Sequence, residues 1–235
     1  MSKKTESPEM RSEMTGGEAA TVPGGSRFVI FDLDGTLIDS NPQLAQVSGR
    51  YFAARGLPPS EEFNEQAKPL NLERFCESIR DRAKSEEPLA ATIDEVTGYI
   101  EEVYAAGVPP KPGAREYVEA LAGQQVRLCV ASATERRLVE GALADLDLLR
   151  HFSFVVTVGE VGRSKEFPDV FLEAARRLGA PDPGEVTVFE DSTAAIRAAK
   201  GAGFHVVGVH DDDTGDLDEQ RRLCDRHIRS FEELL

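Results

Sequence analysis

Cysteine is scarce in this sequence, and the close cysteine and histidine spacings that hold zinc are missing. The three cysteines are Cys76, Cys129 and Cys224, an odd number without a CxxC pair. The four histidines include no HExxH pattern. These spacings argue against a disulfide framework and against a zinc site. Reduced thiols are typical of cytoplasmic proteins, and we expect that location.

Long apolar runs and an excess of basic residues are also missing. No run approaches the roughly 20 residues that a membrane-spanning helix needs. Lys and Arg number 27 against 42 Asp and Glu, which gives a formal net charge of -15. This charge argues against nucleic acid and anionic membranes as partners. It does not exclude an anionic substrate, because a local site can still be positive.

The N-terminal segment lacks the apolar stretch of a signal peptide, so the sequence predicts none. Residues 1–26 are polar and rich in Gly, Ser, Glu and Thr. We expect them to form a disordered tail.

The rest of the 235-residue chain has a globular composition, with 40% hydrophobic and 29% charged residues. This length suits one large domain, or one domain with a smaller insertion. Short apolar runs typical of buried parallel strands alternate with amphipathic helical patterns, which predicts a doubly wound, Rossmann-like α/β fold. The predicted strands lie near 27–33, 126–132, 152–158, 185–191 and 205–209.

One interval interrupts this alternation. Between residues 41 and 108 the sequence shows helical patterns and no convincing strand. We therefore divide the chain into the tail (1–26), a parallel-sheet core domain (27–40 and 109–235) and an inserted all-helical cap domain (41–108). We expect the cap to move relative to the core about linkers near 40–42 and 107–112.

Polar and charged side chains gather where the predicted strands end. The strand ends supply, in order, Asp32 and Asp34, then Ser132, then Lys165, then Glu190 and Asp191. Ligands of open α/β sheets bind at the carboxyl ends of the strands, so these side chains should share one site. Clustered carboxylates without histidine or cysteine suit Mg²⁺, and a neighbouring lysine suits a phosphoryl group.

Four motifs carry a resemblance to a known family. They are "DLDGT" at 32–36, Ser132 in "VASAT", Lys165 in "GRSKEFPD", and "EDS" at 190–192. In this order, over about residues 27–210, the chain resembles the haloacid dehalogenase-like (HAD) superfamily, in the branch with a helical cap after the first motif. One motif departs from the usual K-P-x-P-D pattern, because "KEFPD" lacks the first proline.

The resemblance implies a role for each motif. Asp32 would be the nucleophile that forms an aspartyl-phosphate, and Asp34 would be the general acid and then the base that activates water. The implied phosphate contacts are Gly35, Thr36, Ser132, Ala133 and Lys165. The implied Mg²⁺ ligands are Asp32, the backbone carbonyl of Asp34 and Asp191, with Glu190 as a ligand or as support.

Simpler interpretations exist for several residues. Asp-Gly pairs are common in turns, Ser132 could cap a helix from near Thr134, and Glu190 and Asp191 could cap the helix from Ser192. We interpret the acidic segment "HDDDTGD" at 210–216 as a polar loop rather than a metal site. Some basic cap residues could contact substrate, but solvated helix faces are the simpler expectation for Arg50, Lys68, Arg74 and Arg80.

These motifs are compatible with four functions: a dehalogenase, a phosphatase, a phosphotransferase of the mutase type and a catalytically silent module. Dehalogenases of the superfamily lack the second aspartate, so Asp34 favours phosphoryl chemistry. Residues 63–75 resemble the β-phosphoglucomutase cap, but that family has a histidine where this chain has Leu44 and an arginine near Leu72, with Arg74 two positions away. We therefore expect an enzyme, a Mg²⁺-dependent phosphatase of a small, sugar phosphate-like metabolite, present as a monomer or weak dimer. The alternatives are a β-phosphoglucomutase-type phosphotransferase and a catalytically silent binding module.

Overall fold

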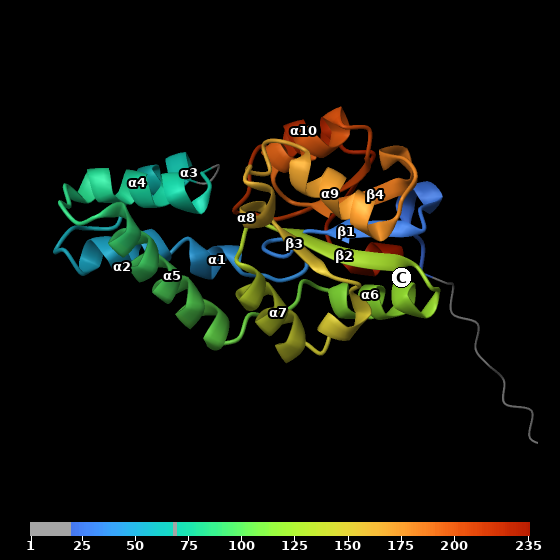
Figure 1. The fold of residues 1–235 in the computed structure, drawn as a ribbon, viewed down its shortest axis with the longest axis horizontal. Helices are drawn as coiled ribbons and strands as arrows, with labels where there is room; N and C mark the ends of the chain where they lie inside the picture. The colour runs from blue at the N-terminus through green and yellow to red at the C-terminus, as the bar shows by residue number, and fades with distance from the viewer. Residues whose placement is uncertain (1–19, 68–69) are drawn as a thin grey trace, which may run out of the picture.

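A six-stranded, all-parallel sheet forms the centre of the molecule, and helices cover both of its faces (Figure 1). The computed structural model describes residues 20–67 and 70–235. The strands are β1 (Phe28–Phe31), β2 (Arg127–Ser132), β3 (Val155–Thr157), β4 (Val186–Glu190), β5 (His205–Val209) and β6 (Arg226–Ile228). Their spatial order is β3-β2-β1-β4-β5-β6. The predicted doubly wound α/β fold is confirmed.

Strand β1 is buried on both faces because successive side chains of a strand point in opposite directions. Val29 and Phe31 belong to one hydrophobic cluster, and Phe28 and Ile30 belong to the other. Helices α6 (Ala114–Gly123) and α7 (Arg136–Asp145) pack on the first cluster. Helices α9 (Asp169–Leu178) and α10 (Thr193–Gly201) pack on the second. A strand covered on both faces, as β1 is, therefore requires an unbroken run of apolar residues.

The strand order reverses between β1 and β4. From β1 the chain proceeds to β2 and β3 on one side, and then crosses to β4, β5 and β6 on the other. β1 and β4 are hydrogen-bonded neighbours, with Phe31 opposite Phe189. Their carboxyl ends therefore flank the kind of crevice in which open α/β sheets bind ligands.

Two features near the chain ends differ from the expectations. The strand β6 was not predicted, because among its residues only Ile228 is apolar and only three residues pair at the sheet edge. Residues 20–26, expected in the tail, contain a 3₁₀ helix (η1, Pro23–Gly25) and the buried residues Ala20 and Ser26. The described part of the expected tail therefore packs on the core, and residues 1–19 lie outside the described residues.

The helices after β1 form a lobe beside the sheet, at the left of Figure 1. They are α1 (Asn41–Leu44), α2 (Val47–Ala53), α3 (Glu61–Ala67), α4 (Leu72–Ala83) and α5 (Leu89–Ala105). The lobe has a hydrophobic core of its own, which includes Tyr51, Phe52 and Ile79. Helix α5 runs back toward the core and contacts α7.

The two linkers between the lobes pair with each other. Ile38 and Pro110 form an antiparallel bridge. The Asp39 amide donates to the Pro109 carbonyl at 2.9 Å, and the Lys111 amide donates to the Leu37 carbonyl at 2.9 Å. The lobes are therefore joined by a short paired ribbon.

The remaining helices are short segments of the core. They are η2 (Leu149–His151), α8 (Val158–Val161), η3 (Pro183–Glu185), α11 (Leu217–Leu223) and η4 (Phe231–Leu234). Within residues 20–67 and 70–235, no helix combines the length and the apolar character that a membrane span requires.

Candidate active site

Three buried carboxylates meet at the carboxyl ends of β1 and β4. Asp32 directly follows β1, Glu190 ends β4, and Asp191 comes next. One carboxylate oxygen from each residue lies within 4.8 Å of the other two. The exposed fractions of Asp32, Glu190 and Asp191 are only 5%, 1% and 3%. The parallel pairing of β1 with β4 thus gathers the acidic residues of the first and last motifs.

Lys165 is the cation that faces this cluster. It lies in the loop between α8 and α9, and its ammonium group donates to Asp32 and, at 2.7 Å, to Glu190. Burial disfavours the charged form of Lys165, but the attraction of Asp32 and Glu190 outweighs burial and raises its pKa. The lysine therefore stays protonated and places a positive charge at the strand ends.

One lysine does not neutralise three buried carboxylates. Burial raises the pKa of Asp32 to about 7; Lys165 opposes the rise, while Glu190 and Asp34 add to it. Burial, together with Glu190 and Asp32, also raises the pKa of Asp191 well above its usual value. Such a cluster favours a further cation. Its oxygen-only donor set fits a hard divalent ion such as Mg²⁺.

Hydroxyl groups from both lobes hold the carboxylate of Asp34. Ser40, in the linker, donates to one oxygen at 2.6 Å, and Thr134, just after β2, donates to the other at 2.7 Å. Tyr104, near the end of the cap helix α5, donates to the same oxygen as Ser40. The Asp34 side chain is therefore oriented by the core, the linker and the cap together.

Gly35 and Thr36 shape the turn after Asp34. Gly35 has a φ of 75°, a left-handed conformation that favours glycine. A Cβ atom there would collide with the side chains of Asn41 and Asp191. The Thr36 hydroxyl donates to one oxygen of Asp191 at 3.1 Å, and the Asn41 amide donates to the other at 3.2 Å. Thr36 and Asn41 therefore help to place Asp191, whereas the resemblance implies phosphate contact for Gly35 and Thr36.

The end of β2 presents Ala133 to the site and buries Ser132. The Ser132 side chain is fully buried, and its hydroxyl accepts a hydrogen bond from the Thr134 amide at 3.0 Å. Helix α7 begins at Arg136 after Glu135, so Ser132 lies too early to be its N-cap. Glu190 bonds locally as well, because it accepts from the Ser192 amide at 2.8 Å.

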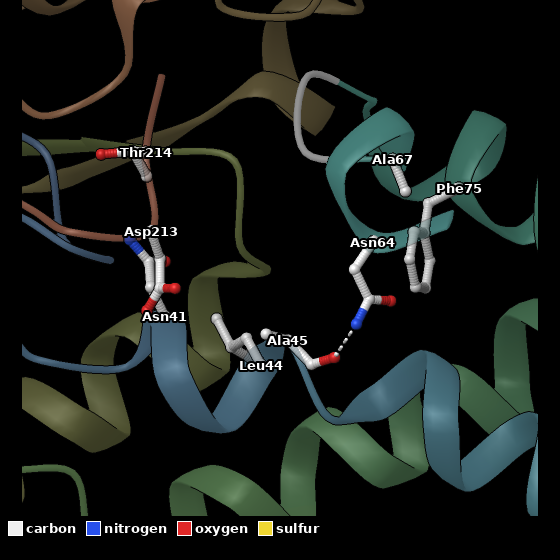
Figure 2. A pocket seen from close by; sticks show the side chains of 8 residues that line it. All are labelled: Asn41, Leu44, Ala45, Asn64, Ala67, Phe75, Asp213 and Thr214. Carbon is white, nitrogen blue, oxygen red and sulfur yellow. Dashed lines mark hydrogen bonds between the residues drawn. The ribbon is translucent and has the colours of Figure 1, made fainter. Parts of the chain in front are cut away.

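Several adjoining hollows lie between the lobes. The first, which we name the carboxylate hollow, has about 190 Å³ and is lined by residues that include Asp32, Asp34, Ala133 and Lys165. Asn41 and Thr214 also line the second, a hollow of about 180 Å³ between α1 on one side and α3 and α4 on the other (Figure 2).

The third hollow, which we name the cap hollow, has about 270 Å³ and lies between the cap helices and the start of α7. It shares Leu44 and Phe75 with the second hollow, and Asn71 and Ala133 with the carboxylate hollow. The three hollows therefore adjoin one another, and we call them together the cleft. Among the described residues that line these three, Lys165 is the only basic one, but a further hollow of about 330 Å³ shares Asn71, Thr134 and Glu135 with the cap hollow and is lined by Arg163 as well.

The basic cap residues lie elsewhere. Arg50 pairs with Glu102 and stacks on the Tyr99 ring, 4.5 Å from its centroid. Arg74 is exposed on α4. Neither these two nor Arg80 lines the three hollows, and Lys68 lies outside the described residues.

Comparison with known proteins agrees with this arrangement. The family model for haloacid dehalogenase-like hydrolase matches residues 27–203. The chain belongs to this family. The phosphorylated carbohydrates phosphatase of Thermotoga maritima is 28% identical to this hydrolase over 182 residues, which cover 77% of this chain and 84% of that protein.

Further relatives of the hydrolase extend the comparison. The validoxylamine A 7'-phosphate phosphatase of Streptomyces hygroscopicus subsp. limoneus is 30% identical over 189 residues, which cover 78% of this chain and 85% of that protein. CbbY from Rhodobacter sphaeroides, solved in complex with phosphate, is 25% identical with a TM-score of 0.77. That match covers 89% of this chain and 96% of the CbbY chain.

The acidic loop of the hydrolase supports the site without forming a metal cluster of its own. In the described part of the chain, the one group of carboxylates with metal-binding spacing is Asp32, Glu190 and Asp191. Asp211 is buried and binds Lys111 of the linker at 2.6 Å. The Thr214 hydroxyl binds the backbone carbonyl of Asp191 at 3.1 Å. The segment 210–216 therefore holds both the linker, through Lys111, and the backbone of Asp191 in place.

Several contributing residues were missed by the sequence motifs. Thr134 lies within "VASAT" and Ser40 closes the segment after "DLDGT", so their proximity to a motif was an available signal. Tyr104 offered no such signal, because its contact with Asp34 requires helix α5 to return to the core. Asn41 depends in the same way on the turn of the linker.

Proposed function

We propose that this HAD-like hydrolase is a Mg²⁺-dependent phosphatase that cleaves a small phosphorylated metabolite through an aspartyl-phosphate on Asp32. The observation that carries the proposal is the buried meeting of Asp32, Asp191 and Lys165 at one edge of the sheet. One part of this site suits a divalent cation, and the other part suits phosphoryl oxygens. Two of the relatives described above are named as phosphatases, which supports the same reaction.

Mg²⁺ would be held by Asp32, Asp191 and the backbone carbonyl of Asp34, with Glu190 as a further ligand or as support. When bound, the cation neutralises charge on the phosphoryl oxygens and on the buried carboxylates. The raised pKa values of Asp32 and Asp191 support this assignment, because the carboxylates need positive charge nearby to stay ionised.

Asp32 acts as the nucleophile. One of its carboxylate oxygens forms a bond to phosphorus while the bond between phosphorus and the leaving oxygen breaks. Asp34 gives its proton to that oxygen, and the alcohol departs. Asp34 then takes a proton from water, which attacks the phosphorus and releases inorganic phosphate and free Asp32. Lys165 neutralises negative charge on the phosphoryl group in both steps.

Hydrolysis is favoured over transfer between two phosphorylated positions. A β-phosphoglucomutase-type reaction must hold a substrate with a second phosphate, whereas in the described part of the chain the basic residues that line the hollows between the lobes are Lys165 and Arg163, and Arg163 pairs with Asp169 at 3.3 Å. Leu44 and Leu72 line the cap hollow where the mutase family has its histidine and arginine. With β-glucose 1-phosphate and a trace of the 1,6-bisphosphate, we expect inorganic phosphate or no reaction. Efficient formation of glucose 6-phosphate would establish the mutase instead.

The deciding experiment is phosphate release from p-nitrophenyl phosphate by the wild-type protein and by Asp32→Asn. We expect release only with Mg²⁺, and a fall in kcat of at least ~10³-fold in the variant, the scale for losing a covalent nucleophile. The variant keeps the shape of the side chain, so its circular dichroism spectrum should match that of wild type. Wild-type turnover in Asp32→Asn, or full activity in chelator, contradicts the mechanism. A silent binding module would show no turnover at all.

A reducing, cytoplasmic location and a monomer or weak dimer complete the proposal. The cysteines Cys76, Cys129 and Cys224 are all free, which supports a reducing compartment. Sedimentation of the purified chain at several concentrations tests the oligomeric state.

A further inference from the structure

We infer that Gln220 is a positioning residue that holds Asp191, a proposed metal ligand, and thereby sets the affinity of the site for Mg²⁺. This inference rests on the proposed function and deepens its metal site. Gln220 and its partner Thr214 lie beyond residues 27–203, which the family model matches, and none of the four motifs includes them. Contacts on the backbone carbonyl of Asp191 carry the inference.

The carbonyl of Asp191 lies between two regular elements. The pairing of β4 with β5 ends at Glu190, opposite Gly208. The first backbone bond of α10 is accepted one residue later, by the Ser192 carbonyl from the Ile196 amide. The Asp191 carbonyl therefore belongs to neither pattern. Among the described residues, only side chains donate to it.

Two side chains from the segment after β5 supply these donors. The Gln220 side-chain amide donates to the Asp191 carbonyl at 2.6 Å, and the Thr214 hydroxyl donates at 3.1 Å. The Gln220 amide nitrogen is also within hydrogen-bond distance of the Thr214 carbonyl, at 3.0 Å, and of the Thr193 hydroxyl, at 3.2 Å. Gln220 therefore ties the end of β4, the start of α10 and the acidic loop together.

The local sequence places Gln220 at this junction. Asp216 caps α11, because its carboxylate accepts from the Asp218 amide at 2.9 Å. Gly215 has a φ of 67°, and a Cβ atom there would collide with the Thr193 hydroxyl. The loop therefore approaches α10 closely, and the helix that follows it directs Gln220 toward the end of β4.

Stability alone does not favour a glutamine at this position. Gln220 is the buried residue of α11, with 0% exposure. An apolar side chain of similar volume would gain from the same burial without polar groups to satisfy. The Gln220 amide oxygen is buried and has no hydrogen-bond partner among the described residues, which costs free energy. A buried amide that bears this cost while its nitrogen binds a site residue indicates a functional role.

Holding this carbonyl also holds the carboxylate. A fixed carbonyl fixes the peptide plane after Asp191, and with it the direction of the side chain. The two carboxylate oxygens of Asp191 are held by Thr36 at 3.1 Å and by Asn41 at 3.2 Å. With its backbone and side chain both held, Asp191 keeps the spacing to Asp32 and Glu190 that suits a divalent cation. Groups that orient metal ligands in this way typically change metal affinity about 10–100-fold when they are replaced.

Replacing Gln220 by Met removes the amide and keeps the length of the side chain. We expect the Kd for Mg²⁺, measured by isothermal titration calorimetry without substrate, to rise at least about tenfold. The Mg²⁺ concentration that half-saturates hydrolysis of p-nitrophenyl phosphate should rise by the same factor, while kcat at saturating Mg²⁺ stays close to that of wild type. A lower Tm with unchanged Mg²⁺ affinity would show that Gln220 only supports the fold, and it overturns the inference.

Thr214 provides a second test that does not depend on the Gln220 variant folding. Thr214→Val removes the other donor and should weaken Mg²⁺ binding by a few-fold, whereas Thr214→Ser keeps the hydroxyl and should bind Mg²⁺ as wild type does. The matched control is Thr187→Val, since that buried hydroxyl donates to the Pro23 carbonyl at 2.9 Å, near the start of β4. Its Mg²⁺ affinity should not change. Equal affinity in Thr214→Val and Thr214→Ser contradicts the inference.

The inference and the proposed function fail in different ways. Mg²⁺-dependent phosphate release by wild type, together with equal Mg²⁺ affinity in wild type and Gln220→Met, overturns the inference and leaves the phosphatase standing. Absence of Mg²⁺-dependent release from wild type contradicts the proposed function, while weaker Mg²⁺ binding by Gln220→Met would still establish the positioning role. A wild-type protein that binds no Mg²⁺ contradicts both.

Discussion

Single hydroxyl groups from distant parts of the chain orient the carboxylate of Asp34. Ser40 belongs to the linker, Thr134 to the end of β2 and Tyr104 to the cap. Tyr104 is the only one of the three that the cap contributes, and the residue is buried, with 6% exposure. A proton donor that must meet the leaving oxygen gains from such fixed orientation. Tyr104 is therefore a positioning residue in the proposed mechanism.

Replacing Tyr104 by Phe removes this hydroxyl and keeps the ring. We expect kcat to fall about tenfold for alkyl phosphates, whose leaving groups need a proton, and to change little for p-nitrophenyl phosphate, whose leaving group does not. Across a series of esters, kcat should therefore depend more steeply on the pKa of the leaving alcohol in the variant than in wild type. Tyr117→Phe is the matched control, because that hydroxyl donates to the Thr21 carbonyl, outside the site. An equal loss for all esters would instead indicate general damage to the fold.

The pKa of Asp32 links stability to pH and to metal. Its value rises from 3.8 to about 7 on folding, so the folded state binds the proton more tightly than the unfolded chain does. In chelator, the free energy of unfolding should therefore decrease as pH rises from 3.8 to about 7. Above about pH 7 the stabilisation that comes from the tighter proton binding is lost completely. Mg²⁺ offsets the loss by binding the ionised carboxylates, so it should raise Tm more near pH 8 than near pH 5. Thermal unfolding at both pH values tests this, and Asp32→Asn should weaken the pH dependence. A larger Mg²⁺ effect near pH 5 contradicts it.

Strands and helices differ in how well the sequence predicted them. The buried strands β1, β2, β4 and β5 were recognisable because parallel strands covered on both faces are continuous apolar runs. Strand β6 was not, because its side chains at the sheet edge are mostly polar and only Ile228 is fully buried. The helical interval 41–108 was recognisable from its periodicity, whereas the packing of α5 against α7 depends on long-range contacts.

The contacts of the candidate site also differ in how well the sequence predicted them. Asp32, Glu190 and Asp191 were predicted together because each lies at the end of a buried strand, and the strand ends share an edge. The contacts of Tyr104, Asn41 and Lys111 were not predicted, because they depend on how the cap and the linkers fold back on the core. Local pattern determines the first kind of contact, and tertiary packing determines the second.

The linker ribbon contains a buried ion pair that should stabilise the junction of the lobes. Lys111 binds Asp211 at 2.6 Å and Asp39 at 3.1 Å, and the Asp211 side chain is only 2% exposed. Lys111→Met would leave Asp211 buried without a counter-charge, so we expect a loss of about 3–5 kcal/mol in the free energy of unfolding. Denaturation in urea measures this loss.

Lys200→Met is the matched control for the linker variant. Lys200 pairs with Asp225 at 2.8 Å, but both side chains are more open, at 28% and 31% exposure. An exposed pair contributes at most about 1 kcal/mol, so this variant should remain close to wild type. Similar losses in the two variants would show that Lys111 acts only as a surface charge.

The whole molecule presents a strongly acidic surface to an anionic substrate. The formal net charge is -15, while the described residues that line the hollows between the lobes include only Lys165 and Arg163 as basic ones. Long-range repulsion should therefore weaken the encounter with a phosphate ester, even though the site itself is built to receive one. Salt screens such repulsion over about 10 Å at 0.1 M ionic strength.

Added KCl should accordingly lower KM for p-nitrophenyl phosphate at saturating Mg²⁺, by a few-fold between about 0.01 and 0.1 M, and leave kcat unchanged. The direction follows from like charges: screening removes repulsion between the acidic protein and the anion, whereas the contacts of Lys165 inside the buried site are screened much less. Sucrose in place of KCl is the control for effects of solutes other than charge, and it should leave KM where it was. A KM that rises with salt would mean that local attraction at the cleft dominates the field of the whole acidic surface.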